Sequence, residues 1–306
     1  MASTTVKDSR PLDGKVAIVT GATGGLGYET ALGLAARGAT MIVAGRNAAK
    51  GARAVARIQR TVPDAKVRFE PLDLASLASV ARFAAAYGGV VDILVNNAGV
   101  MGLAERQVTE DGFERQVGVN YLGHFALTAR LKDALCASGG GGRVVNVASL
   151  AHRRAVLGLE DFQSERSYRP MAVYGRSKLA MLVFAIELQR RAERNRWNLR
   201  GVAAHPGWAR TEIIGNGIGG GAPGIKARVI AGVFDLMAQS AHDGALPLLY
   251  AATAPQAEGG AYYGPTGMGE TRGAPGPSWI APQAADPAAG AALWSLSEKL
   301  TGLTFA

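Results

Sequence analysis

Short apolar runs alternate with longer stretches of helical periodicity along most of the chain. The runs occupy residues 16–20, 40–44, 67–71, 93–96, 144–148 and 201–205, and a seventh occupies residues 261–263. Each run is short and largely apolar, and turn-forming residues follow most of them. Runs of this kind are typical of strands in a parallel sheet, because such a sheet is buried on both faces.

Between these runs, apolar residues recur every three or four positions, which predicts helices. The predicted helices cover residues 28–37, 48–60, 76–87, 112–137 and 174–196, and a last one lies near residues 291–301. No linker rich in proline, glycine or serine interrupts this alternation before about residue 200. The pattern predicts an α/β fold with a doubly wound parallel sheet of the Rossmann type. We expect a single domain over residues 13–306, preceded by an arm of residues 1–12.

The turn after the first predicted strand is rich in glycine and opens directly into a helix. Glycine lets the backbone approach a ligand closely, and the free N–H groups of a helix N-terminus attract phosphate. In this strand–turn–helix context the pattern predicts a dinucleotide-binding site. A tight turn that serves only packing is the alternative. The residues of the turn that we expect to bind are Gly21, Thr23, Gly24, Gly25, Leu26 and Gly27.

The end of the second predicted strand indicates which dinucleotide is bound. In NAD sites an acidic residue about 20 positions past the glycines binds the ribose 2′-hydroxyl, whereas an arginine there accommodates a 2′-phosphate. This chain has Gly45 at that place, followed by Arg46. A hydrogen bond to a charged group contributes about 1.5–3 kcal/mol. Arg46 therefore predicts NADP(H) as the cofactor, with a solvated surface arginine as the alternative.

Tyr174 and Lys178 stand at the start of an apolar helical stretch. Positions i and i+4 share one face of a helix, so the ammonium group can lie beside the phenol. A phenol titrates near pH ~10 in water, and a nearby cation can lower its pKa by roughly 1–3 units. The pair predicts a proton donor that works near neutral pH, although this spacing also arises by chance in helices.

In their order along the chain, these features resemble the short-chain dehydrogenase/reductase family over about residues 13–270. The Asn-Asn-Ala-Gly sequence at residues 96–99 favours the simple branch of that family over the extended branch of sugar-nucleotide epimerases. Residues 120–125, 145–152 and 205–207 resemble the retinol dehydrogenase and protochlorophyllide reductase group, with departures at Ala148 and Met181. The matching motifs are the glycine turn, Asp73 and Leu74, residues 96–99, Asn120, Ser149, Tyr174 and Lys178, and Pro206, Gly207 and Thr211.

The resemblance implies a catalytic role for four of these residues. Tyr174 would be the general acid in reduction and the general base in oxidation, a contribution of typically ~10²–10⁴-fold in rate. Lys178 would lower the pKa of that phenol and hold the nicotinamide ribose. Ser149 would donate a hydrogen bond to the substrate oxygen and stabilise charge that develops there. Asn120 would fix a water molecule that links Lys178 to solvent protons.

The same resemblance distributes the other matching residues along the nucleotide, from adenine to nicotinamide. Tyr174 and Lys178 would contact the nicotinamide ribose in addition to their catalytic roles. In order along the nucleotide, the others are Asp73 and Leu74 at the adenine ring, Asn97, Ala98 and Gly99 at the adenosine ribose, and Pro206, Gly207 and Thr211 at the nicotinamide amide.

Two insertions distinguish the chain from a minimal member of the family. Residues 150–172 are rich in arginine, and a loop of this length is usually functional or mobile. We expect part of the substrate wall there, with a solvated surface loop as the alternative. Residues 211–243 begin with glycines and continue as an apolar helix, which suits a substrate lid. These apolar residues favour a hydrophobic substrate, although they could equally belong to the core. A C-terminal extension, residues 264–306, is expected to pack on the lid or on a second subunit.

The composition of the chain limits which kinds of binding partner and site are expected. The formal net charge is +9, but the chain carries no recognised nucleic-acid motif, and an anionic cofactor accounts for part of the excess. The single cysteine, Cys136, excludes an internal disulfide and a cysteine-based metal site. The four histidines lack metal-ligand spacing, so no metal is predicted, and His124 is expected to cap or pack in its helix. No apolar run approaches the ~18 residues that span a bilayer.

Location and assembly follow from the same patterns. Residues 1–10 are polar and show no secretory signal, so we expect a cytoplasmic protein that does not bind membranes. The helix predicted from residue 174 is apolar on more than one face, which indicates burial. The resemblance implies that this helix and the one over residues 112–137 form a subunit interface. We therefore expect a homodimer or homotetramer.

These observations predict an NADPH-dependent carbonyl reductase that acts on a bulky, mostly apolar ketone or aldehyde. An alcohol dehydrogenase that works in the oxidative direction uses the same residues and is the first alternative. A non-catalytic NADP-binding sensor or scaffold is an alternative of another class. It is disfavoured because Tyr174 and Lys178 are both present. The identity of the substrate is not predicted.

Overall fold

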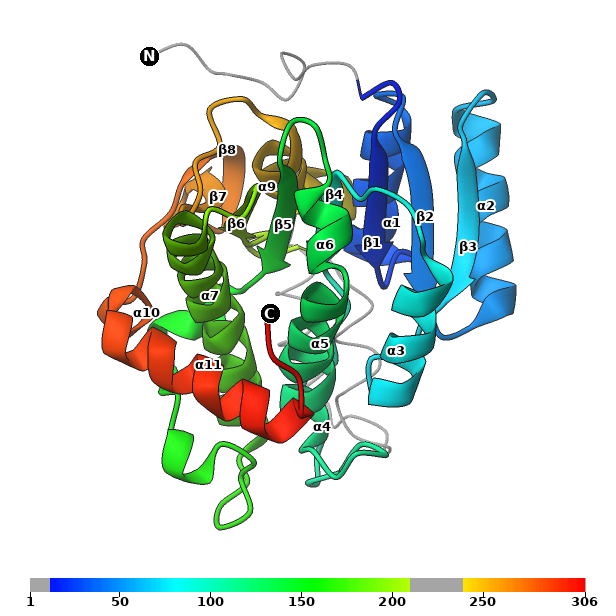
Figure 1. Cartoon of the computed structure of the whole chain (residues 1–306). Coiled ribbons are helices and arrows are strands. Elements are labelled where there is room, and N and C mark those ends of the chain that lie inside the picture. Colours follow the sequence, from blue (N-terminus) through cyan, green and yellow to red (C-terminus); the bar gives the residue numbers. More distant parts are fainter. Residues whose placement is uncertain (1–11, 210–238, 306) are drawn as a thin grey trace, which may run out of the picture.

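An eight-stranded sheet runs through the part of the chain that the computed structural model describes, residues 12–209 and 239–305 (Figure 1). Its order is β3-β2-β1-β4-β5-β6-β7-β8, and β8 alone runs antiparallel to its neighbour. The strand order reverses between β1 and β4, the position at which open α/β sheets bind their ligands. The α/β prediction is therefore confirmed. The strands are β1 (Val16–Thr20), β2 (Thr40–Gly45), β3 (Val67–Pro71), β4 (Ile93–Asn96), β5 (Gly142–Val147), β6 (Leu199–Ala204), β7 (Tyr262–Gly267) and β8 (Arg272–Pro277).

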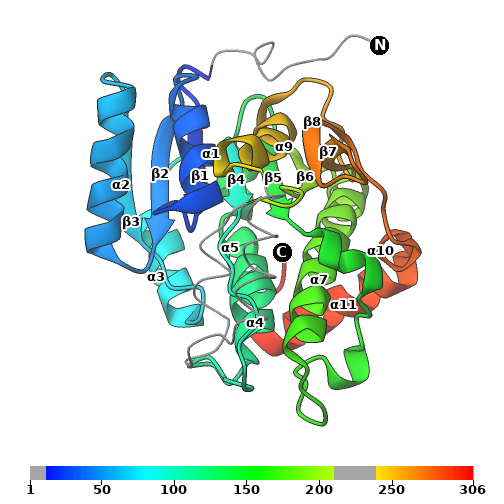
Figure 2. The ribbon, with the colours of Figure 1, turned by 180° about the vertical axis from the view of Figure 1, so that it is seen from behind.

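Helices cover both faces of the sheet, and each layer has its own apolar core. Successive side chains of a strand point to opposite faces, so Ile18 packs in one core and Val19 in the other. The core around Val19 includes α1, α2 and α9, whereas the core around Ile18 includes α3, α5 and α7 (Figures 1 and 2). The longer helices are α1 (Gly25–Ala35), α2 (Ala48–Thr61), α3 (Leu77–Ala86), α5 (Gly123–Arg130), α7 (Pro170–Asn195), α9 (Ala241–Thr253) and α11 (Pro287–Thr301).

The predicted helix over residues 112–137 is wrong as a continuous element. It is divided into α4 (Arg115–Val117), a π-helical turn (Gly118–Leu122), α5 and α6 (Lys132–Cys136). In the π-helical turn the backbone N–H of Gly123 donates to the carbonyl of Gly118, five residues earlier. Leu131 then leaves helical geometry, with φ −98° and ψ 3°. The apolar periodicity of the sequence does not reveal such breaks. A helical turn that contains one extra residue still leaves the apolar side chains facing the core.

Two elements near the C-terminus were not predicted. The helix α9 contains Pro247, and its first residues lay inside the segment that we assigned to the lid. The strand β8 has the sequence Arg-Gly-Ala-Pro-Gly-Pro, which lacks the β-branched and aromatic residues typical of strands. It lies at the edge of the sheet, where proline is tolerated because only one side of the strand needs donors.

The predicted lid lies outside the described residues except for residues 239–243, and Thr211 lies outside them as well. The C-terminal extension is described up to Phe305. Its helix α11 packs on α7 of the same chain, as Figure 1 shows. The expected contact of this extension with a second subunit is therefore not needed to bury α11.

Candidate functional site

Most of the residues predicted to bind the nucleotide come together in one cavity at the carboxyl ends of β1, β2 and β4, whereas Tyr174, Lys178, Pro206 and Gly207 do not line it. Its volume is about 480 Å³. The predicted residues that line it are Gly21, Thr23, Gly24, Gly25, Leu26, Gly27, Arg46, Asp73, Leu74, Asn97, Ala98 and Gly99. The cavity therefore unites motifs from four separate segments of the sequence.

The glycine turn is closely packed, and its conformation requires glycine at particular positions. Gly21 has φ +66° and Gly25 has φ +51°, values that other residues rarely adopt. A Cβ atom on Gly27 would lie 2.5 Å from Asn97 Nδ2. The helix α1 begins at Gly25 and receives no side-chain cap from Gly24. Its N-terminus, which attracts negative charge, therefore lies at the wall of the cavity.

Three basic side chains line the same cavity. Arg46 was predicted, whereas Lys50 and Arg115 were not. Lys50 lies in the first turn of α2, whose N-cap residue Asn47 accepts a hydrogen bond from the Lys50 backbone N–H. The N-terminus of α2 and the two cations beside it, Arg46 and Lys50, favour an anionic group at this end of the cavity. The i+4 spacing from Arg46 to Lys50 was a usable signal in the sequence, but no local pattern indicates Arg115.

Tyr174, Ser149 and Lys178 meet where the end of β5 faces α7. Ser149 lies close enough to Tyr174 for its hydroxyl to lower the pKa of the phenol. Lys178 Nζ lies 6.0 Å from the centre of the Tyr174 ring and donates to the carbonyl of Val147 at 2.8 Å. Tyr174 and Lys178 are both buried. The three side chains predicted to act on the substrate are therefore neighbours.

Burial sets the protonation of this pair. It raises the pKa of Tyr174, and the neighbouring hydroxyl of Ser149 offsets only part of that rise. It lowers the pKa of Lys178 from 10.5 to about 8. Our expectation that the lysine lowers the phenol pKa is not met by the protein groups alone, because a buried site disfavours the charged form of both residues. Near neutral pH, the phenol therefore keeps its proton.

Asn120 lies in the π-helical turn, and its side chain is held on two sides. Its Oδ1 accepts from the Val100 N–H at 2.7 Å, and its Nδ2 donates to the Val100 carbonyl and to Ser177 Oγ, both at 2.9 Å. A Cβ atom on Gly99 would lie 3.2 Å from Asn120 Oδ1 and 3.7 Å from Lys178 Nζ. Asn120 and Lys178 therefore both border Gly99, which also lines the cavity.

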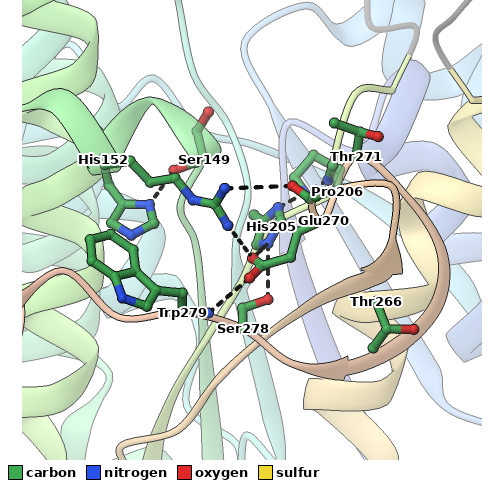
Figure 3. Close-up of polar contacts among 12 residues, drawn as sticks. Ser149, His152, His205, Pro206, Thr266, Glu270, Thr271, Ser278 and Trp279 are labelled. Carbon is green, nitrogen blue, oxygen red and sulfur yellow. Dashed lines mark hydrogen bonds and ion pairs between the residues drawn. The ribbon is translucent and has the colours of Figure 1, made fainter.

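Pro206 and Gly207 lie in a turn shortly after β6, at the carboxyl end of that strand. Gly207 has φ +67°, and its N–H donates to Nδ1 of His205 at 3.1 Å. The other ring nitrogen of His205 lies 3.2 Å from Glu270 Oε2 and 3.0 Å from Ser278 Oγ (Figure 3). Backbone geometry at this turn is thus fixed by a histidine that the sequence analysis did not single out.

Glu270 connects this turn with the segment after Ser149. It forms an ion pair with Arg153 at 2.8 Å. It also accepts from the Trp279 N–H at 3.1 Å (Figure 3). Burial raises the pKa of Glu270, but the hydrogen bond from the Trp279 N–H and the charge of Arg153 lower it by more, so the carboxylate stays ionised. The acid lies between β7 and β8, more than one hundred residues from Arg153, and no sequence pattern could have paired them.

Residues 150–172 are anchored to the protein rather than solvated throughout. Leu157 and Phe162 are buried, with 2% and 3% of their surface exposed. Arg176 of α7 donates to the carbonyl of Asp161 at 2.7 Å and to Ser164 Oγ at 2.8 Å. The alternative of a solvated loop is therefore wrong for this part, and the segment forms a structured border next to Ser149.

Two kinds of feature are missing from the described residues. Among residues 12–209 and 239–305, no helix combines the length and apolarity needed to cross a bilayer. The same residues contain no group of three or more histidine, cysteine, aspartate or glutamate side chains arranged to hold a metal ion.

Comparisons with known proteins agree with this site. The sequence model of the short chain dehydrogenases matches residues 15–217. The chain is 43% identical to polyprenol dehydrogenase of Mus musculus over 255 residues, which cover 81% of this chain and 74% of that protein. It is 39% identical to retinol dehydrogenase 13 of Homo sapiens, over 95% of this chain and 86% of that protein. A crystal structure of an uncharacterized protein from Mycobacterium paratuberculosis matches with a TM-score of 0.82 and 37% identity, and the match covers all of both chains.

Proposed function

The chain belongs to the short chain dehydrogenase family, and on this premise we propose that it is an NADPH-dependent carbonyl reductase. Its substrate would be a bulky, mostly apolar ketone or aldehyde. The observation that carries the proposal is the group formed by Ser149 and the buried Tyr174 and Lys178 beside the nucleotide cavity. NADPH, once bound, would supply a hydride.

The chemistry at the substrate oxygen follows from the protonation of these side chains. A carbonyl that accepts hydride becomes an alkoxide and needs a proton. Tyr174 keeps its proton near neutral pH, because burial raises its pKa, and can donate it to that oxygen. The hydroxyl of Ser149 lies beside Tyr174, so both side chains can reach one oxygen and stabilise its charge.

Lys178 is placed to support this step. Its Nζ has one partner among the described residues, the Val147 carbonyl, so two of its three donors remain for other groups. With a pKa of about 8, it is mostly cationic at neutral pH and favours the phenolate that forms as Tyr174 gives up its proton. A Cβ atom on Gly99 would crowd Asn120 Oδ1 at 3.2 Å and would be in ordinary contact with Nζ at 3.7 Å.

The preference for NADPH is supported by the charges at the adenosine end of the cavity. Arg46, Lys50 and Arg115 line it together with the N-terminal turn of α2. A 2′-phosphate is the feature that distinguishes NADPH from NADH, and cations with free donors are the groups that bind it. Pro206 and Gly207 would contact the nicotinamide amide, and Asp73 the adenine.

An apolar substrate is supported by exposed side chains on the segments that border the site. Val156 and Met171 lie on the chain between Ser149 and Tyr174 and have 65% and 58% of their surface exposed. Trp279, which packs beside His152, is 48% exposed. Relatives named for polyprenol and retinol, both long apolar alcohols, point the same way.

The oxidative direction is the second candidate function, and the same relatives favour it, because they are named as dehydrogenases of alcohols. The two directions share every residue described above. They differ in the required charge of Tyr174, which must be ionised to act as a base. The raised pKa of Tyr174 therefore favours reduction at neutral pH.

The proposal is tested by a panel of carbonyl compounds and the matching alcohols. Loss of NADPH absorbance is followed with isoprenoid-like, polycyclic and long-chain aldehydes and ketones at neutral pH, and the alcohols are offered with NADP⁺. We expect apolar aldehydes or ketones to be reduced faster than the alcohols are oxidised. Turnover only of alcohols would favour the oxidative function, and absence of turnover in both directions would refute the enzymatic proposal.

A further inference from the structure

His124 joins two parts of the site that are far apart in sequence. It is fully buried in α5, directly after the π-helical turn that carries Asn120. Its Nδ1 lies 2.9 Å from the carbonyl oxygen of Asn120, and its Nε2 lies 2.8 Å from Oγ1 of Thr20 at the end of β1. The prediction that His124 only caps or packs in its helix is therefore incomplete.

The direction of each hydrogen bond at His124 can be deduced. A carbonyl oxygen only accepts, so Nδ1 must carry the ring proton that it shares with Asn120. Burial lowers the pKa of His124 to about 3, so the ring is neutral at physiological pH and Nε2 has no proton. Nε2 therefore accepts, and the hydroxyl of Thr20 donates to it at 2.8 Å in preference to the Val95 carbonyl, which lies 3.3 Å away.

Thr20 extends the connection to the nucleotide cavity. Its Oγ1 accepts hydrogen bonds from the backbone N–H groups of Asn97 at 2.9 Å and Ala98 at 3.0 Å. A continuous chain of hydrogen bonds thus runs from the backbone N–H groups of Asn97 and Ala98 through Thr20 and His124 to the carbonyl of Asn120. Hydrogen bonds aligned in this way in a buried site strengthen one another.

The end of this chain is a segment that needs support. A π-helical turn is rare and persists where its surroundings hold it. The Asn120 side chain is held by Val100 and Ser177, but its carbonyl is held by the ring of His124. Asn120 and Lys178 border the same glycine, so a displaced turn would also change the environment of the lysine.

We propose that His124 is a positioning residue that fixes the carbonyl of Asn120, and with it the π-helical turn, relative to the glycine turn. The inference rests on the proposed reductase function, because the turn it fixes lies beside Lys178. His124 itself acts through Asn120 and Thr20 and touches neither substrate nor cofactor. A displacement of about 1 Å at such a site can cost roughly 10²-fold in rate.

Three substitutions separate the two hydrogen bonds of the ring. His124→Asn places an amide nitrogen near the position of Nδ1, so it can keep the bond to Asn120. His124→Gln places its polar group near Nε2, so it can keep the bond to Thr20 only. His124→Phe fills the space and removes both bonds. The three variants are compared with the wild type in kcat, KM, the Kd of NADPH and Tm.

We expect turnover to follow the bond to Asn120. His124→Asn should keep kcat within about threefold of the wild type, whereas His124→Gln and His124→Phe should lose about 10- to 100-fold in kcat. The Kd of NADPH for His124→Gln should stay within about threefold, because its bond to Thr20 remains. Losses in kcat that follow Tm across all three variants, or a His124→Phe enzyme with wild-type kcat, would overturn the proposal.

Hydrogen exchange provides a readout that needs no substrate. The amides of Val100 and Gly123 donate to Asn120 Oδ1 and to the Gly118 carbonyl, so their exchange reports on the turn. We expect faster exchange of both in His124→Gln and His124→Phe, but not in His124→Asn, with the amides of β5 unchanged. Equal exchange in all variants would overturn the inference. If the wild type reduces no carbonyl compound, the reductase proposal fails, while these exchange rates still decide the role of His124.

Discussion

The protonation of single residues decides what this site can do. Tyr174 and Lys178 are both buried, and burial moves their pKa values in opposite directions, each toward the neutral form. A phenol that keeps its proton beside a lysine that can still be charged is suited to proton donation. The attraction between the two residues becomes important only when Tyr174 loses its proton, which is the moment at which catalysis needs it.

The first prediction concerns the phenol itself. Tyr174→Phe removes the proton donor and leaves the ring, so we expect kcat to fall by at least about 10²-fold. The Kd of NADPH, measured by nicotinamide fluorescence, should change little, because the cavity lining is untouched. Tyr250→Phe is a matched control, since Tyr250 lies in α9 away from the cavity and should keep normal turnover. Retained turnover in Tyr174→Phe would exclude this residue as the donor.

The second prediction concerns the cofactor. Arg46→Asp places a carboxylate where the 2′-phosphate is expected, and Lys50→Ala removes a second cation. A hydrogen bond to a charged group contributes about 1.5–3 kcal/mol, so each change should weaken NADPH binding roughly 10- to 100-fold and leave NADH binding nearly unchanged.

The measurement is the ratio of kcat/KM for NADPH and NADH. Arg53→Asp makes the same charge change in the next turn of α2, at an exposed position outside the cavity, and serves as the control. If Arg46→Asp and Lys50→Ala keep the ratio of the wild type, the 2′-phosphate is held elsewhere or is absent from the natural cofactor.

At the scale of elements, α11 explains why α5 and α7 are apolar on more than one face. Trp294 of α11 lies 5.3 Å from Phe125 and 5.8 Å from Phe184, measured between ring centres, and Phe305 lies 5.1 Å from Phe125. The guanidinium group of Arg191 lies over the Trp294 ring, with its Cζ atom 4.2 Å from the ring centre. The surface on which we based the expected subunit interface is therefore covered by the C-terminal part of the same chain, at least around these aromatic residues.

The third prediction follows from the packing of α11 on α5 and α7. Trp294→Ala should lower the free energy of unfolding by about 3–5 kcal/mol, as for other buried tryptophans, and should expose Phe125 and Phe184. Urea unfolding measures the first effect, and light scattering should show increased self-association. Trp279→Ala, at a half-exposed position, should cost much less. A Trp294→Ala protein with unchanged stability would mean that α11 adds little to this core.

The sequence predicted those elements whose signals are local. Residues 16–20 form β1 as expected, and the glycine turn follows it, because strand, turn and helix N-terminus are adjacent in the chain. Glu270 and Arg115 reach the site through tertiary contacts, which leave no local pattern. The strand β8 is stabilised by pairing with β7 at the edge of the sheet, against its own composition. Local rules fail where a distant neighbour determines the structure.

At the scale of the whole molecule, the site reduces the stability of the fold that carries it. Lys178 is buried with a pKa of about 8, against its ordinary value of 10.5. Below pH 8 it is charged in both the folded and the unfolded chain, and holding that charge inside costs roughly 3 kcal/mol. Between about pH 8 and 10.5 the folded protein releases the proton while the unfolded chain keeps it. The cost therefore disappears as the pH rises through this range.

The fourth prediction tests this cost in the protein without cofactor. Lys178→Met removes the charge and the hydrogen bond to the Val147 carbonyl, which contributes about 1 kcal/mol, so we expect a net gain of about 2 kcal/mol at pH 7. The Tm should rise by about 4 °C, with turnover lost. Lys299→Met, at an exposed position of α11, should change the Tm little. The gain should shrink between pH 8 and 10.5. A gain that persists at pH 10.5 would arise from packing, whereas a loss at pH 7 would show that the buried ammonium stabilises the fold.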